Sequence, residues 1–266
     1  MTTKYTIKPI EIDESGLNII EKDIFIHPAL YVGVGSVASG KSTLLANIIE
    51  FWQDIFENRI ILFSPSLNDP IIDKLVKEDK IFTHFQTYDN GTLETCLQAI
   101  KMEEEMSKNK GNKWLICFDD MLSQLPKSNQ GEAKYFNHYI SRYRHYPVEG
   151  KVSIVMFSQY WKDFNPVVRN NISYIMFLGS HSEKNKKVYA EELSSLFNGS
   201  EDDFYTAWND AKSTNKYDFL TLDFRHLKAY KNFEKLLYSR DKPETLEDVK
   251  PDTKNEEDAT ENNSNE

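Results

Sequence analysis

The sequence predicts an α/β fold in which helices cover both faces of a mainly parallel central sheet. Short apolar runs of strand length alternate along the chain with longer segments whose apolar residues recur at helical spacing. A glycine-rich motif connects the first of these strands to the first of these helices. Because strands that alternate with helices pair in parallel through helical crossovers, both observations favour this architecture.

The strands are expected from the apolar runs. Residues 29–34 form a continuous apolar run, as is typical of a strand buried on both faces. The second strand ends at the turn signal Ser64-Pro65, the third is weaker than the others, and the last alternates between polar and apolar residues. In chain order, the expected strands are residues 29–34, 59–64, 81–85, 114–118, 152–158, 174–178 and 218–223.

The helices are expected where apolar residues recur every three or four positions. Leu44, Leu45 and Ile48 place one helix directly after the glycine-rich motif. The remaining expected helices are residues 71–76, 93–107, 187–196 and 202–212.

Residues 1–240 have the length and composition of one α/β domain. The 266-residue chain has a net charge of −10, which is unevenly distributed. Residues 241–266 contain ten acidic residues and three lysines, so this tail carries −7 and residues 1–240 carry −3. The tail is nearly free of apolar residues and is expected to be disordered, because it buries too little surface to offset its chain entropy. It is either a solubilising extension or a segment that mimics nucleic acid or recruits a basic partner.

Two cysteines are too few for a disulfide framework, and no zinc-site spacing is present. Cys117 lies in an apolar run, and we expect it to be a small core residue. The N-terminal residues are polar, and no apolar run approaches membrane-spanning length. We therefore expect no signal peptide, no transmembrane segment and no membrane partner.

The glycine-rich motif, Gly35 to Ser42, matches G-x-x-x-x-G-K-[ST], the phosphate-binding P-loop known as Walker A. Its glycines let the backbone turn tightly, so that successive N–H groups point at phosphate oxygens. Lys41 is expected to reach the β- and γ-phosphates, and the Ser42 hydroxyl to bind Mg²⁺. The expected nucleotide-binding residues are Gly35, Ser36, Val37, Ala38, Ser39, Gly40, Lys41, Ser42 and Thr43.

A second motif has the form of a Walker B element. The apolar strand that begins at Trp114 ends in the carboxylates Asp119 and Asp120. In such folds ligands bind beyond the carboxyl ends of the strands, beside the P-loop. Asp119 is expected to hold Mg²⁺, and Asp120 to orient or deprotonate the attacking water. The alternative is a strand that ends in a solvated acidic turn.

Three further side chains are candidates for catalysis. Gln159 follows the strand at 152–158 and is expected to sense the γ-phosphate or position water, unless it makes only local turn hydrogen bonds. Arg144 and Arg169 flank that strand in the sequence. Either is a candidate arginine finger from a neighbouring subunit, and the alternative for each is a surface ion pair.

Basic and aromatic residues are interleaved between the Walker B strand and the Gln159 strand. An acidic net charge does not exclude nucleic-acid binding, because a motor needs only a local basic surface. The spacing fits a DNA-facing channel and an amphipathic helix with a solvated face equally well. The residues are Lys127, Lys134, Arg142 and Arg144 among Tyr135, Phe136, Tyr139 and Tyr143.

The stretches GSVASGKS, ILFSPSLND, WLICFDDM, RYRHYPVEGKVSIVMFSQ and NPVVRNNISYIMFL resemble the FtsK/HerA-type genome-packaging ATPases of poxviruses, giant viruses and virophages. The resemblance spans residues 26–224. It implies an additional-strand (ASCE, RecA/FtsK-like) P-loop ATPase that uses ATP and Mg²⁺. It also implies a homo-oligomeric ring, a pentamer or hexamer, that pumps double-stranded DNA into a viral capsid and contacts capsid proteins. The implied location is the host cytoplasm, the viral factory or the virion.

The same resemblance assigns roles to particular residues. It places Mg²⁺ on Ser42 and Asp119, the catalytic carboxylate on Asp120 and the sensor on Gln159, and it implies a trans-acting arginine. The cellular FtsK/HerA proteins usually have Glu at the second acidic position, whereas this chain has the shorter Asp120.

Other functions are compatible with a P-loop. Residues 215–218, Asn-Lys-Tyr-Asp, match the guanine-reading N-K-x-D of GTPases, but Leu122 and Ser123 stand where D-x-x-G needs glycine. Residues 215–218 are therefore interpreted as a turn that enters the strand at 218–223. A small-molecule kinase would need an arginine-rich lid, and an ABC-type ATPase would need an L-S-G-G-Q-like signature. A P-loop ATPase or nucleotide-dependent scaffold that acts without DNA is the remaining alternative.

Overall fold

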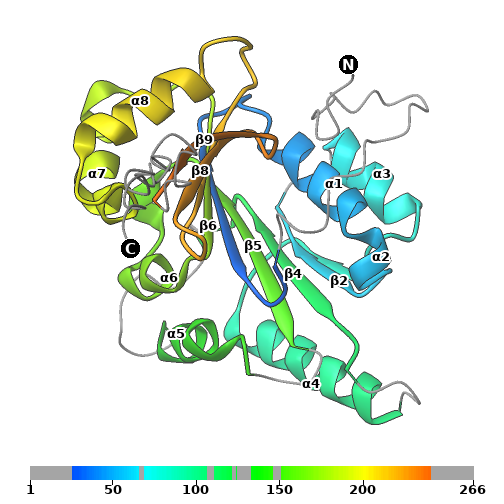
Figure 1. Cartoon of the computed structure of the whole chain (residues 1–266). Coiled ribbons are helices and arrows are strands. Elements are labelled where there is room, and N and C mark those ends of the chain that lie inside the picture. Colours follow the sequence, from blue (N-terminus) through cyan, green and yellow to red (C-terminus); the bar gives the residue numbers. More distant parts are fainter. Residues whose placement is uncertain are drawn as a thin grey trace, which may run out of the picture.

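The computed structural model describes residues 26–65, 69–106, 111–121, 124, 133–145 and 151–240. Within these residues one sheet runs through the molecule in the strand order β3-β2-β4-β5-β1-β6-β7-β8-β9 (Figure 1). The strands are β1 (Leu30–Gly35), β2 (Ile60–Phe63), β3 (Thr83–Phe85), β4 (Trp114–Asp119), β5 (Val152–Ser158), β6 (Tyr174–Leu178), β7 (Leu220–Asp223), β8 (Lys228–Lys231) and β9 (Lys235–Ser239).

The sheet is mainly parallel, as the sequence predicts. Every pairing from β3 to β6 is parallel, and β7, β8 and β9 continue the sheet in antiparallel fashion. All the expected strands are present, although β3 is shorter than residues 81–85 and β7 begins only at Leu220. The antiparallel β8 and β9 were not expected from the sequence, because the apolar residues of 228–239 occur in short groups between charged residues and show neither a long run nor a strict alternation.

Helices lie on both faces of the sheet, which confirms the predicted layers. In Figure 1, α1, α2 and α3 lie on one side of the sheet, and α4, α5 and α6 lie on the other. The helices are α1 (Lys41–Phe51), α2 (Gln53–Phe56), α3 (Pro70–Lys77), α4 (Asn90–Met106), α5 (Ala133–Arg142), α6 (Pro166–Asn171), α7 (Glu183–Leu193) and α8 (Glu201–Ala211). Two 3₁₀ turns, Trp161–Asp163 and Ser194–Phe197, complete the described elements.

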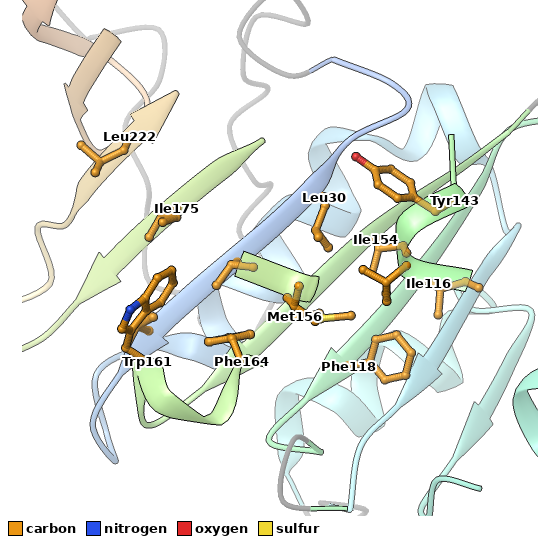
Figure 2. Close-up of a cluster of buried hydrophobic side chains, with 14 of the residues drawn as sticks. Leu30, Ile116, Phe118, Tyr143, Ile154, Met156, Trp161, Phe164, Ile175 and Leu222 are labelled. Carbon is orange, nitrogen blue, oxygen red and sulfur yellow. The ribbon is translucent and has the colours of Figure 1, made fainter. Parts of the chain in front are cut away.

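Two clusters of buried side chains hold these layers together. Leu30 and Val32 of β1 belong to the cluster under α4, α5, α7 and α8, whereas Tyr31 belongs to the cluster under α1 and α3. This alternation arises because successive side chains of a strand point to opposite faces. Figure 2 shows part of the first cluster, where Leu30, Ile154 and Ile116 come from three neighbouring strands.

The interleaved basic and aromatic residues form an amphipathic helix, α5, and the turn that follows it. Phe136, Tyr139 and Tyr143 are at most 2% exposed and pack in the core, so these rings do not line a channel. Lys134 and Arg144 are exposed. Lys127 lies outside the described residues.

The remaining expectations concern the cysteines, the termini and membranes. Cys117 is fully buried, which confirms it as a core residue, and Cys96 is buried as well. The tail at 241–266 lies outside the described residues, and so do residues 1–25. Among the helices of the described ranges, none combines the length and the apolar character that crossing a membrane requires.

Candidate nucleotide-binding site

The P-loop lies between β1 and α1 and makes a tight turn. Ala38 and Gly40 have φ angles of 58° and 91°, in the left-handed region that glycine adopts without strain. Gly35 allows a close approach, because a Cβ there would lie 2.4 Å from Ser39 Oγ. The loop therefore folds back on itself before α1 begins at Lys41.

Lys41 is held at the mouth of this loop. Its side chain is 7% exposed, and Nζ donates to the carbonyl oxygens of Gly35 at 3.0 Å and Ser36 at 3.2 Å. Asp120 Oδ2 lies 3.8 Å from the same ammonium. The charge predicted to reach the phosphates is thus positioned between the P-loop and the Walker B carboxylates.

The carboxyl ends of three parallel strands meet beside the P-loop. The register pairs Val34 of β1 with Ser158 of β5, and Phe157 of β5 with Asp119 of β4. The polar residues that end these strands are therefore brought to one edge of the sheet, as expected for this class of fold.

A cavity of about 620 Å³ opens at this edge. Its lining includes most of the predicted site: Val37, Ala38, Ser39, Gly40, Lys41, Ser42, Thr43, Asp119, Asp120 and Gln159. Gly35 and Ser36 are not part of the lining and instead supply the carbonyl groups that hold Lys41. Further lining residues were not expected in the site from the sequence: Leu44, Asp69, Ile71, Leu178, Asn215, Tyr217 and Phe219.

Asp69 is a carboxylate residue of the cavity lining that was not expected there from the sequence. It caps the N-terminus of α3, where its Oδ1 accepts from the backbone N–H of Ile71 at 2.9 Å. The signal in the sequence was the Asp-Pro pair, because aspartate is favoured at the N-cap and Pro70 at the first helical position.

Asp119 is only 3% exposed. Burial, followed by the nearby charge of Asp120, raises the pKa of the Asp119 carboxyl from 3.8 to about 7. Its Oδ1 has no hydrogen-bond partner among the described residues. An orphaned carboxylate oxygen in a buried position is costly unless a ligand uses it.

These residues fit a magnesium ion. Mg²⁺ prefers hard oxygen ligands and is usually held by one or two protein groups together with phosphate oxygens. Asp119 and Ser42 line the same cavity and carry such oxygens. In the described part of the chain no group of three or more His, Cys, Asp or Glu could hold a metal, so a cage made of protein alone is not found there.

We predict that Asp119→Asn stabilises the protein at pH 8 in the absence of Mg²⁺ and ATP. The pKa of Asp119 is higher in the folded state than its ordinary value, so its stabilising proton is lost as the pH rises through about 7. Between pH 5 and pH 8, the wild type should lose about 1–3 kcal/mol of unfolding free energy that the variant keeps. Thermal unfolding at the two pH values measures this, and equal losses in both proteins would contradict it. Addition of Mg²⁺ and ATP should stabilise the wild type much more than the variant.

Asp120 and Gln159 border the same cavity. Asp120 is 36% exposed and adopts a φ of 51°, which turns the chain directly after β4. Its N–H donates to the carbonyl oxygen of Phe157 at 3.2 Å, so the turn is attached to β5. Gln159 follows β5, where the preceding Ser158 donates to Asp163 Oδ2 at 2.8 Å and fixes the strand end.

Neither candidate arginine lines the cavity. Arg169 Nη1 donates to the two carboxylate oxygens of Glu192 at 3.0 and 2.7 Å, and the guanidinium lies 5.7 Å from the ring centroid of Trp161. Arg144 is exposed, and its Nε donates to the hydroxyl of Tyr143 at 3.1 Å. Arg169 is thus ion-paired within the subunit, whereas Arg144 makes no ion pair with a described residue, and its guanidinium lies 5.5 Å from the ring centroid of the buried Tyr143.

The fold and the site define a P-loop NTPase of the additional-strand type, since β5 lies between the P-loop strand β1 and the Walker B strand β4. Residues 21–222 match the family described as Poxvirus A32 protein. The chain belongs to this family, which confirms the resemblance to viral packaging ATPases seen in the sequence.

Solved structures share the fold. The genome packaging NTPase B204 of Sulfolobus turreted icosahedral virus 2, in complex with ATP-gammaS, superposes with a TM-score of 0.56 at 16% identity, over 80% of this chain and 100% of that chain. B204 of Sulfolobus turreted icosahedral virus, described as the DNA-packaging ATPase, has a TM-score of 0.56 at 15% identity, over 77% and 98% of the two chains. At this identity the likeness shows the fold alone. The sequence matches none of the curated proteins.

Proposed function

We propose that this chain is an ATP-driven motor that moves double-stranded DNA into a viral capsid. The observation that carries the proposal is the convergence of Lys41, Ser42, Asp119, Asp120 and Gln159 on one cavity in a member of the Poxvirus A32 protein family. The shared fold of B204, a genome packaging NTPase, supports it.

Each polar residue of the cavity has a separate role in ATP binding or hydrolysis. The P-loop N–H groups and the N-terminus of α1 hold the phosphates of ATP, and Lys41 contacts the β- and γ-phosphates. Ser42 and Asp119 hold Mg²⁺, which when bound neutralises the charge of the phosphates. Asp120 orients the attacking water or accepts its proton, and Gln159 reports the presence of the γ-phosphate.

A motor whose active site is completed across a subunit interface couples hydrolysis in one subunit to its neighbours. We infer that identical subunits form a ring in which Arg144 of one subunit completes the cavity of its neighbour. The ring would track the phosphate backbone, a contact that carries no sequence information. In this account the ring meets capsid proteins during packaging and is located with the assembling virus.

The proposal is tested by the rate of ATP hydrolysis with and without double-stranded DNA. We expect double-stranded DNA to stimulate the full chain, and Asp120→Asn to lower the stimulated rate by about 10²-fold or more, because the amide cannot accept the proton of the water. The variant should still bind ATP, since Asp120 is not a phosphate ligand. Full turnover by Asp120→Asn would show that another residue activates the water.

A further inference from the structure

We propose that Tyr217 and Asn215 form the base-binding end of the cavity and accept adenine and guanine nucleotides with similar affinity. The base would stack on the ring of Tyr217. This inference rests on the proposed nucleotide-driven function and identifies which part of the chain holds the base.

The topology brings these residues to the P-loop from far along the chain. The antiparallel strand β7 begins with Leu220 opposite Phe177 of β6, so the residues before β7 lie at the carboxyl end of β6. At this end, Gly35 of β1 is paired with Leu178 of β6. The turn at residues 215–219 is therefore held next to the loop that binds the phosphates.

Tyr217 stands directly beside the P-loop. A Cβ placed on Gly40 would lie 3.7 Å from Tyr217 Cδ1, so the ring is adjacent to the last glycine of the motif. The side chain is 53% exposed although it lines the cavity. Leu178 and Phe219 line the same end and are each 2% exposed. An exposed aromatic ring in a cavity that apolar side chains also line is the kind of surface on which a base stacks.

One face of this ring has a neighbour already. The ammonium of Lys216, an exposed residue, lies 5.2 Å from the centroid of the Tyr217 ring. A base would use the face of the ring that Lys216 does not cover.

The carboxylate that would read guanine is not available to the base. In an N-K-x-D site the Asp accepts from the N–H groups of guanine. Here Asp218 is 8% exposed, and its Oδ2 accepts from Lys231 Nζ at 2.7 Å and from the N–H of Asn215 at 2.8 Å. Its Oδ1 accepts from Asn232 Nδ2 at 3.2 Å. These bonds tie Asp218 to β8 and the turn after it, and Asp218 does not line the cavity.

Asn215 offers the edge of a base one neutral amide. Its Oδ1 accepts from the N–H of Tyr217 at 3.4 Å, and the amide N–H groups remain donors for a base. An amide N–H finds a ring-nitrogen acceptor on adenine and on guanine alike. Stacking on Tyr217 beside a neutral amide, with Asp218 engaged elsewhere, therefore gives affinity for a purine but little discrimination between the two purines.

The test compares Tyr217→Ala and Tyr217→Phe in the full chain, by titration with ATP, GTP and tripolyphosphate in the presence of Mg²⁺. Tyr217→Ala should weaken ATP and GTP about tenfold, the lower part of the range for one stacked base. Tyr217→Phe should bind both as the wild type does, because it keeps the ring. Tripolyphosphate has no base, so its affinity should be equal in all three proteins. The dissociation constants of the wild type for ATP and GTP should agree within about threefold, because no free carboxylate contacts the edge of the base.

Three results would overturn the inference. ATP affinity in Tyr217→Ala equal to wild type places the base elsewhere. An equal loss of tripolyphosphate affinity shows damage to the P-loop rather than a lost stack. A preference of the wild type for either purine of more than about threefold means that an edge contact reads the base. The proposed motor function is tested by a different result. If nucleotide binding depends on Tyr217 but DNA does not stimulate hydrolysis, the base-binding site is supported and the proposed function is rejected.

Discussion

Lys41→Ala should abolish ATP hydrolysis and leave capsids empty of DNA. The ammonium of Lys41 is the positive charge positioned between the P-loop and Asp120, and it is expected to stabilise the charge that develops on the transferred phosphoryl group. Removal of a single preorganised donor of this kind costs about 10²-fold or more in turnover. Hydrolysis by the purified chain, together with the DNA content of capsids made with the variant, measures both effects.

The fold should survive this substitution. Lys41 is bound to two backbone carbonyl groups and lies near one half-exposed carboxylate, and α1 remains packed through Leu44, Leu45 and Ile48. The melting temperature in the absence of nucleotide should therefore stay within a few degrees of wild type, roughly the effect of 1 kcal/mol. Lys41→Arg is the matched control, since it keeps the charge but replaces a compact ammonium by a planar fork. If capsids made with Lys41→Ala contain a normal amount of DNA, the assignment of Lys41 to the ATP site that drives packaging is wrong.

Arg144→Ala should lower DNA-stimulated hydrolysis by about 10³-fold without weakening ATP binding. Arg144 is exposed, makes no ion pair with a described residue and does not reach the cavity of its own subunit. These features suit a group that acts on the neighbouring subunit. The matched control is Arg169→Ala, which removes a group already bound to Glu192 and Trp161. It should cost about 1 kcal/mol of unfolding free energy and leave turnover largely intact.

Mixed rings identify a trans-acting arginine directly. Arg144→Ala subunits keep an intact P-loop, and Lys41→Ala subunits keep Arg144. If the arginine acts in trans, mixing the two inactive variants should restore part of the DNA-stimulated hydrolysis, because some cavities then receive Lys41 from one subunit and Arg144 from the other. No recovery in rings shown to be mixed would contradict the assignment, as would a 10³-fold loss in Arg169→Ala alone.

The sequence predicts best those parts of the molecule that depend on burial and on local backbone geometry. The apolar runs ending at Asp119 and Ser158 identify β4 and β5 because both are buried on two faces, where a strand needs no polar side. The P-loop is equally apparent, since Gly35 and Gly40 occupy positions where a side chain would clash or strain the backbone. By contrast, β8 and β9 lie toward one end of the sheet and mix apolar and charged residues without a regular alternation, so periodicity does not reveal them.

The base-binding end of the cavity could not be predicted from the sequence for a topological reason. Asn215 and Tyr217 are separated from Gly40 by more than half of the chain, and they reach it only because β7 turns back antiparallel against β6. The sequence of residues 215–218 predicts a turn that enters a strand, and the structure confirms this turn. Their place in the cavity depends on the pairing of β6 with β1, which no local pattern encodes.

The central claim is that ATP hydrolysis by this chain drives movement along double-stranded DNA. The most direct measurement is the displacement of a triplex-forming oligonucleotide from a linear duplex by the full chain. We predict displacement with ATP and none with ATPγS, with Lys41→Ala or with Asp120→Asn. Vigorous DNA-stimulated hydrolysis that leaves the third strand in place would contradict the claim, because the energy of ATP would then be released without translocation.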